Sequence, residues 1–359
     1  MAGGDISVVK KDGWIYFISD KDRMNGSLCN FYKIGKTDYD RPIEVRLKEH
    51  QTGNPREVII VESIRTSFID TLETYLHHRF ATNCIYNEWF KFNNKELKEA
   101  IKEAKKINRW MNKYAKDVEK GTKYRDKKSS SKTIKPNKKI KATHTNYVKN
   151  MSKYTKLHLK QEIVLKKIKA INDNRMGIDG IISLTYSDPS FTLDTDKLQN
   201  ERGALYRRFL ETKNVWNKRT FNIIGKPTPA KSESTLYKKL GAEKTGLGEC
   251  KQVNQLDMKK PIKRKSKKSI GLHLEYLKLM EQKADVRLKS LFFEFVLKAH
   301  CGTAKEVIGL CKWDRSMVTN TTFNKSSFKK NHPGITKKYL KKPNSAITRK
   351  MVTYRKYSW

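Results

Sequence analysis

Charge is distributed very unevenly along this 359-residue chain. Residues 1–100 contain 15 Lys and Arg and 15 Asp and Glu, whereas the remainder holds 63 bases and 22 acids and so carries the whole net charge of +41. Hydrophobic residues make up 37% of the chain and charged residues 32%, which predicts that parts of the chain are loosely ordered. We therefore expect a neutral N-terminal module joined to a basic remainder whose partner is a polyanion.

The sequence argues against a membrane protein. No apolar run reaches 18 residues, so no spanning helix is expected, and the short opening segment with Asp5 does not resemble a signal peptide. Five cysteines lie far apart without a CxxC pair, which is typical of reduced thiols. We expect an intracellular, cytoplasmic protein with no membrane association and no evident protein partner.

Residues 1–118 have the pattern of an α+β module. Short β-branched and aromatic runs predict three strands, and apolar residues at three- and four-residue spacing predict helices. Asn93 and Glu96 have the spacing of a capping box at the start of the last helix. The predicted strands are residues 14–18, 31–34 and 58–61, and the predicted helices are residues 42–50, 68–80 and 93–118.

Downstream composition divides the rest of the chain into three parts. Residues 119–160 are read as a basic linker or arm, because residues 120–160 contain fourteen Lys and Arg and one acid. Residues 161–258 are expected to form a small mixed or helical region, with helices near 159–171 and 198–210 and a strand near 178–186. Residues 259–359 are expected to be a basic, mostly helical DNA-binding region. Within it residues 303–323 could be a helix-turn-helix or a plain helical hairpin.

Several residues of the N-terminal module suit phosphodiester hydrolysis, which needs a base for water, a metal and a cation for the developing charge. Tyr16 and Lys33 fall on the two strands of the predicted hairpin. Arg46 and His50 are four residues apart and share one helix face, as do Glu73 and His77 on a later helix.

These residues carry a family resemblance that covers residues 13 to about 105. Gly13-Trp-Ile-Tyr16, Lys33-Ile-Gly35, Arg46, Glu73 and Glu88-Trp-Phe90 follow one another in the order of the GIY-YIG nuclease superfamily. The Lys-Ile-Gly and Glu-Trp-Phe segments are most similar to a branch common in phage and bacterial proteins. The first glycine stands one position early, and Lys33 stands where many members have tyrosine, although Tyr32 is adjacent.

The resemblance implies a small antiparallel three-stranded sheet flanked by helices and hydrolysis with Mg²⁺ or Mn²⁺. It implies that Tyr16 positions or deprotonates the water with help from Lys33, and that Arg46 stabilises charge at phosphorus. His50 would contact phosphate or relay a proton, and Glu73 would bind the metal. Supporting roles fall to Tyr32, Gly35, His77, Glu88 and Trp89, of which His77 and Trp89 are better explained by packing.

The leading hypothesis is a metal-dependent DNA endonuclease of homing or phage type, with a C-terminal basic targeting region and a bacterial or phage-infected cell as its setting. The alternative is a non-catalytic DNA-binding protein that uses a nuclease-like scaffold, and an RNA-directed protein is a third reading. The expected phosphate contacts lie in two basic runs. They are Lys138, Lys139, Lys141, Lys263, Arg264 and Lys265.

Overall fold

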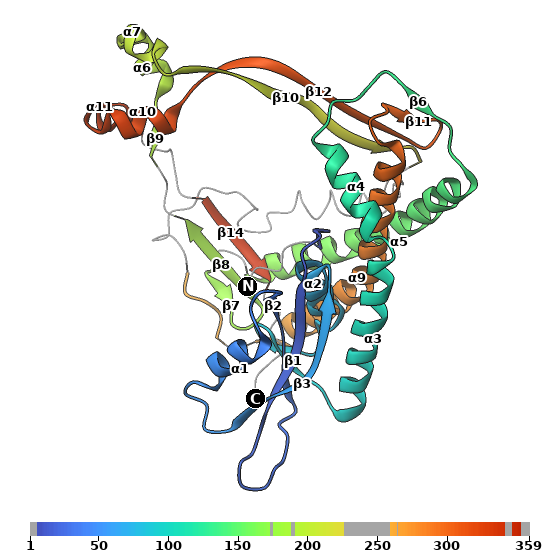
Figure 1. The fold of residues 1–359 in the computed structure, drawn as a ribbon. Helices are drawn as coiled ribbons and strands as arrows, with labels where there is room; N and C mark the ends of the chain where they lie inside the picture. The colour runs from blue at the N-terminus through green and yellow to red at the C-terminus, as the bar shows by residue number, and fades with distance from the viewer. Residues whose placement is uncertain are drawn as a thin grey trace.

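The computed structural model describes residues 6–172, 175–187, 191–225, 259–263, 265–341 and 347–352. It is an α+β structure with an N-terminal antiparallel sheet, two long helices that pack along each other and a long two-stranded ribbon that arches away from them (Figure 1). The α+β fold class, the N-terminal sheet with flanking helices and the helices of the C-terminal region are confirmed.

The N-terminal sheet has five strands in the order β3-β1-β2-β5-β4, and its neighbouring strands are antiparallel. The three expected strands are present, and β2 continues through Gly35, where the sequence predicts its end. The closing Glu-Trp-Phe segment and the residues before it add two strands. The bounds are β1 Gly13–Lys21, β2 Phe31–Asp38, β3 Glu57–Thr66, β4 Cys84–Tyr86 and β5 Trp89–Lys91.

Alternation along β1 gives the sheet two different faces. Ile15 and Phe17 point into the main core beneath α2 (Ile69–Arg79) and α3 (Asn94–Asn112). Tyr16 and Ile18 point to the opposite face, which α1 (Ile43–Gln51) covers. The expected capping box starts α3, with Asn93 and Glu96 each accepting a backbone N–H of the other. The helix predicted to reach residue 118 is divided into α3 and α4 (Ala115–Arg125).

Two 35-residue helices, α5 (Lys138–Asn172) and α9 (Lys267–Cys301), form the body of the molecule. Side chains of α9, among them Leu288 and Phe292, are part of the N-terminal core. The prediction of a linker over residues 119–160 is wrong, because α4 ends and α5 begins within it. Ile140, Tyr147 and Met151 are buried at helical spacing while most of the lysines between them face outward.

The ribbon consists of β10 (Leu210–Ile223) paired with β12 (Cys311–Phe323). Both helical predictions for residues 303–323 are therefore wrong. Gly309, at φ 72°, makes a turn that sends the chain into β12, where β-branched residues such as Thr319 pair with β10. At the base of the ribbon, β11 (Glu306–Val307) pairs with β12 and with β6 (Thr133–Ile134).

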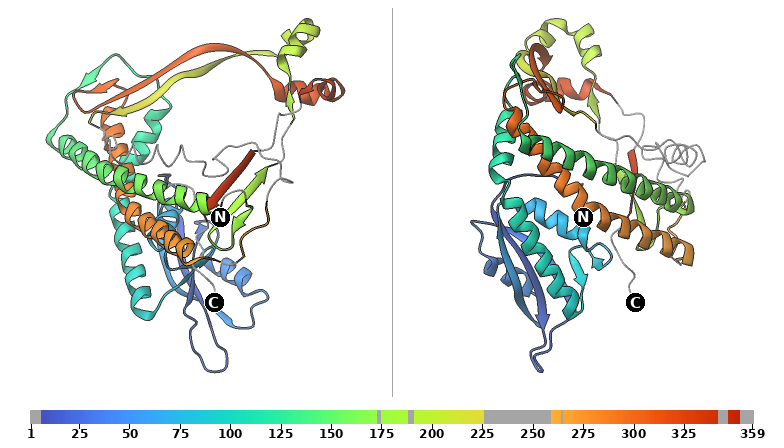
Figure 2. Two further views of the ribbon diagram at one scale, coloured as in Figure 1. Left: turned by 180° about the vertical axis from the view of Figure 1, so that it is seen from behind. Right: turned by 90° about the vertical axis from the view of Figure 1, so that its right-hand side faces the viewer.

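At its far end the ribbon carries a small group of helices that stands away from the body in all three views (Figures 1 and 2). Its elements are β9 Thr192–Leu193, α6 Thr195–Glu201, α7 Gly203–Arg207, α10 Lys325–Asn331, α11 Pro333–Lys338 and β13 Leu340–Lys341. The helix expected over residues 198–210 is thus two short helices. A further three-stranded sheet confirms the strand expected near 178–186. Its strands are β7 Gly177–Ile178, β8 Ile182–Ser187 and β14 Ile347–Val352.

Within the described part of the chain, neither α5, α9 nor any shorter helix has the length and hydropathy needed to cross a bilayer.

Candidate active site

Two glycines allow the close approach of the elements that hold the site. Gly35 lies opposite Tyr16 in the β1–β2 pair, and a Cβ at this glycine would lie 2.6 Å from the Tyr16 hydroxyl oxygen. A Cβ on Gly13 would lie 2.5 Å from Cδ1 of Ile69 on α2. Both distances are far below van der Waals contact, so each position requires glycine for steric reasons.

The hydroxyl of Tyr16 lies 3.4 Å from Nε2 of His50, which is on α1. Burial, opposed in part by Arg46, raises the pKa of Tyr16, whose side chain is 1% exposed. Burial together with the charges of Lys33 and Arg46 lowers the pKa of His50. His50 is therefore neutral at neutral pH and Tyr16 is protonated, so the phenol can donate its proton to the imidazole.

Arg46 lies one turn before His50 on the same face of α1, as their spacing predicts. Its Nη1 is 2.6 Å from a carboxylate oxygen of Glu49, while its buried Nε has no hydrogen-bond partner. A buried donor without an acceptor is costly. The Nε is thus available to an oxygen that enters the site.

The structure places Lys33 away from the role expected for it. Its ammonium group is 3.0 Å from the carboxylate of Glu88, and both side chains are largely buried. His50, and not Lys33, therefore contacts the Tyr16 hydroxyl, and Lys33 acts through its charge, which lowers the pKa of His50. The backbone carbonyl of Glu88 also accepts the N–H of Ile34, which links the Glu-Trp-Phe segment to β2.

Three of the expected supporting residues, Tyr32, His77 and Trp89, contact the protein itself: they pack in the sheet or hydrogen bond to its backbone. Tyr32 is 1% exposed and lies in the core on the face opposite Tyr16, where it packs near Phe92. His77 hydrogen bonds through Nε2 to the carbonyl of Ile34 at 2.9 Å, which agrees with the packing role preferred for it. Trp89 lies in β5 opposite Lys33.

Glu73 does not pair with His77 but with Lys36, a residue that the sequence reasoning missed. The Lys36 ammonium group lies 2.8 Å from Glu73 and 2.6 Å from Asp70, which precedes Glu73 by almost one turn of α2. Burial disfavours the charge on Lys36, but the two carboxylates outweigh it and raise its pKa. The carboxylates of Asp70 and Glu73 thus both point to the place occupied by the ammonium group of Lys36. Their i, i+3 spacing was the signal that could have identified Asp70.

Lys36 and Arg46 also line the same small pocket of about 170 Å³, together with Thr37, Asp38 and Arg41. Three cations and one acid surround this space, but each cation is also paired with an acid. The Nε of Arg46 is the group in this lining that remains open to a phosphate oxygen. Arg41 was likewise missed, and it is held by Glu49, the same acid that binds Arg46.

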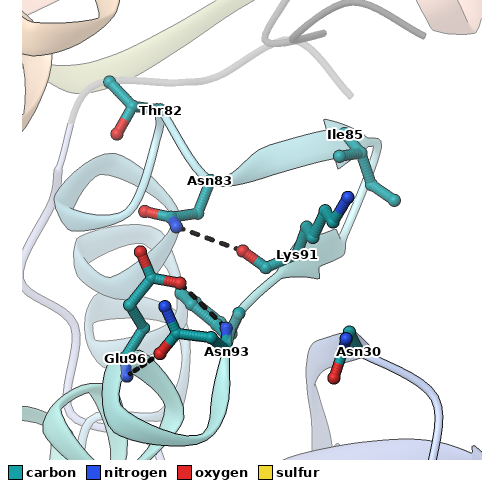
Figure 3. Close-up of a pocket in the computed structure, with 8 residues that line it drawn as sticks. Asn30, Thr82, Asn83, Ile85, Lys91, Asn93 and Glu96 are labelled. Carbon is teal, nitrogen blue, oxygen red and sulfur yellow. Dashed lines mark hydrogen bonds between the residues drawn. The ribbon is translucent and has the colours of Figure 1, made fainter. Parts of the chain in front are cut away.

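A second, larger pocket of about 460 Å³ lies beside β4 and β5 (Figure 3). Most of its polar side chains are engaged with one another or with neighbouring groups. Asn83 donates to the carbonyl of Lys91, Asn93 and Glu96 form the capping box, and Thr82 donates to Glu281 of α9. Nothing in this lining points to catalysis.

The expected phosphate contacts lie elsewhere in the chain. Lys138, Lys139 and Lys141 are exposed at the start of α5, and Lys263 is exposed just before α9. Lys265 is half-buried near Gly180. Arg264 lies outside the described residues.

Comparison with known protein families gives a match in the N-terminal part of the chain. The T5orf172 domain family matches residues 13–105, which is about a quarter of the chain and coincides with the sheet, α1, α2 and most of α3. Neither the curated proteins nor the solved structures include a significant match. Residues 13–105 are therefore similar to the T5orf172 domain, which is associated with nucleases.

Proposed function

We propose that this protein is a metal-dependent DNA endonuclease of the GIY-YIG type, with its active site between β1, β2, α1 and α2. The observation that carries the proposal is the contact of the Tyr16 hydroxyl with a neutral His50, beside an Arg46 whose Nε lacks a partner. A phenol, a proton acceptor and a phosphate-binding cation are the groups that hydrolysis of a phosphodiester requires. Their position within a region similar to a nuclease-associated domain supports the same reading.

The donor set suits Mg²⁺ or Mn²⁺. Among the described residues no group of three or more His, Cys, Asp or Glu could hold a metal, but Mg²⁺ keeps several waters and needs only one or two carboxylates. Glu73 is buried, and its carboxylate and that of Asp70 both contact the ammonium group of Lys36, which occupies the place where a metal ion would bind. Glu73 would hold the ion with Asp70 beside it. When bound, the metal would neutralise a phosphate oxygen and favour ionisation of the attacking water.

The proposed proton path rests on the contact between the Tyr16 hydroxyl and Nε2 of His50. Tyr16 positions the attacking water, accepts its proton and passes its own hydroxyl proton to Nε2 of His50. The oxygen of that water forms a bond to phosphorus as the ester P–O bond breaks, and the leaving oxygen takes a proton from solvent. Because burial keeps Tyr16 protonated and His50 neutral before the reaction, the pair starts in the required state.

Charge at phosphorus is met by the cations of the small pocket. The free Nε of Arg46 can bind a non-bridging oxygen, and Lys36 lies in the same pocket. A donor aimed at developing charge in a buried site contributes about 10²–10³ in rate. The basic remainder of the chain, including Lys138 to Lys141 and Lys263, provides attachment to the DNA backbone.

The test is cleavage of plasmid DNA with Mg²⁺ by the full chain. Tyr16→Phe and Glu73→Gln should each lower the cleavage rate by about 10²-fold or more, while far-UV circular dichroism stays that of the wild type. Lys91→Gln, an exposed change at the second pocket, is the control and should cleave normally. Equal nicking by wild type and Glu73→Gln would refute the catalytic assignment.

One observation favours a second candidate, a DNA-binding protein that does not cut. Lys36 already neutralises Glu73, and a lysine can replace a metal structurally in a scaffold that has no catalytic function. This candidate predicts steep salt dependence of DNA binding and no metal-dependent cleavage in the same assay.

A further inference from the structure

The cations of the ribbon and of the group of short helices at its far end (the tip) have different surroundings. The ribbon, residues 210–223 and 311–323, has its exposed cations paired with acids. The pairs are Lys213 with Glu211, Lys218 with Asp314, Arg219 with Asp126, and Lys312 with Glu306. Each exposed cation of the ribbon is therefore offset by an acid, two of which, Asp126 and Glu306, lie just outside it, so phosphates would gain little from these cations.

The tip, residues 192–209 and 324–341, has a different charge pattern. It contains ten Lys and Arg and only three Asp and Glu, and all ten cations are exposed. Of these ten, Lys197 alone forms an ion pair with a carboxylate of the described residues, Glu201 at 3.8 Å. Nine guanidinium and ammonium groups of the tip thus form no ion pair among the described residues; eight of them are carried on short helices or their ends, and Lys341 lies in β13.

The apolar side chains of the tip are used inside it. Leu198, Phe328 and Tyr339 are buried in its own core, Tyr206 stacks on Phe323 with ring centroids 4.5 Å apart, and Phe209 meets Phe328 edge to face. These rings are engaged with one another and do not form a free platform. Binding of single strands relies on such platforms, so the tip suits the phosphate backbone of a duplex instead.

The ribbon also sets the reach of the tip. A strand of the 14 residues in β10 spans about 45 Å, which exceeds the roughly 34 Å of one turn of B-DNA. The tip stands clear of the N-terminal module at the end of this span (Figures 1 and 2). A DNA duplex bound at the tip could therefore be held away from the rest of the protein.

We propose that the tip is a docking site for the phosphate backbone of duplex DNA and that the ribbon, whose exposed cations are offset by acids, is a spacer which holds it away from the body. The proposal rests on the proposed function only in taking DNA as the polyanion. It places a contact with DNA in residues 192–209 and 324–341, outside the two basic runs of the sequence in which phosphate contacts were expected.

The experiment measures binding of a fluorescent DNA duplex to the full chain by anisotropy in EDTA, at salt concentrations from about 50 to about 200 mM. The tip variant is Lys329→Gln/Lys330→Gln/Lys337→Gln. Its control is Lys95→Gln/Lys98→Gln/Lys102→Gln on the exposed face of α3, which removes the same charge from lysines that form no ion pair among the described residues. Glutamine keeps the helix propensity of lysine, so both variants should fold.

The tip variant should bind at least about tenfold more weakly than the control. Its slope of log K against log salt should be shallower by about one for each phosphate that the removed lysines neutralise in the wild type. Equal affinities and slopes in the two variants would overturn the proposal. Duplex RNA that competes as well as DNA would overturn the assignment to DNA. Cleavage with Mg²⁺ is scored separately, so a wild type that binds through the tip but does not cut would refute the nuclease and leave the docking site intact.

Discussion

Replacing Gly35 with alanine tests whether the hairpin positions Tyr16. The new Cβ would lie 2.6–2.7 Å from three atoms of the Tyr16 side chain, Cε2, Cζ and the hydroxyl oxygen. Ordinary contacts begin near 3.4 Å, so the ring must move by close to 1 Å. Tyr16 is 1% exposed and packs with Ile18, Ile43 and Val58, which leaves it no free direction.

Two effects should follow from Gly35→Ala. Overpacking of this kind lowers the free energy of unfolding by about 1–3 kcal/mol. Moving the hydroxyl by about 1 Å from His50 should cost about 10²-fold in the cleavage rate. Urea denaturation measures the first effect, and single-turnover cleavage of plasmid DNA without urea, at a temperature where the variant is fully folded, measures the second.

Gly271→Ala is the matched control, because a Cβ at this exposed position of α9 has no heavy atom within 4 Å. It should leave cleavage unchanged and raise the free energy of unfolding by about 0.5–1 kcal/mol, since glycine is unfavourable inside a helix. If Gly35→Ala is as stable and as active as Gly271→Ala, the steric argument for the site is wrong.

Three further predictions concern other contacts. The cleavage rate should be flat near neutral pH and fall once the pH drops below the lowered pKa of His50, because only neutral imidazole accepts the Tyr16 proton; His50→Gln should remove this acid limb from the pH–rate profile. Lys36→Met should tighten Mg²⁺ binding measured by calorimetry, since it removes the cation that occupies the two carboxylates, and unchanged affinity would contradict that placement. Arg315→Leu should lower the free energy of unfolding by about 3 kcal/mol in urea titrations, because this 1%-exposed guanidinium group donates to the carbonyls of Tyr124 and Gly302. A stability loss below about 1 kcal/mol would show that those carbonyls find other partners.

Local sequence patterns were sufficient where neighbouring residues decide the structure. The β1–β2 hairpin, the helices carrying Arg46 and Glu73 and the capping box at Asn93 all depend on residues within one or two turns or a single hairpin. The i, i+4 spacing likewise placed Arg46 and His50 on one face of α1, where the structure brings His50 to Tyr16.

Long-range contacts decided the rest. The helical prediction for β12 is wrong because its partner β10 lies about a hundred residues earlier, and only pairing such as Thr212 with Thr321 satisfies its backbone. The basic segment before residue 160 became part of α5 because α9 covers its apolar side.

The candidate active site shows the same difference between what local sequence predicts and what long-range contacts set. The candidate side chains could be chosen from their chemistry alone, because a phenol, an imidazole, a guanidinium group and a carboxylate can bind protons, phosphate or metal in any fold. Tertiary structure decided their partners: His50 rather than Lys33 lies at Tyr16, Glu88 holds Lys33, and Lys36 lies on Glu73. The reason is physical, because burial and the distance between charges set proton affinity and pairing, and both arise only when β2, α1 and α2 come together in the fold.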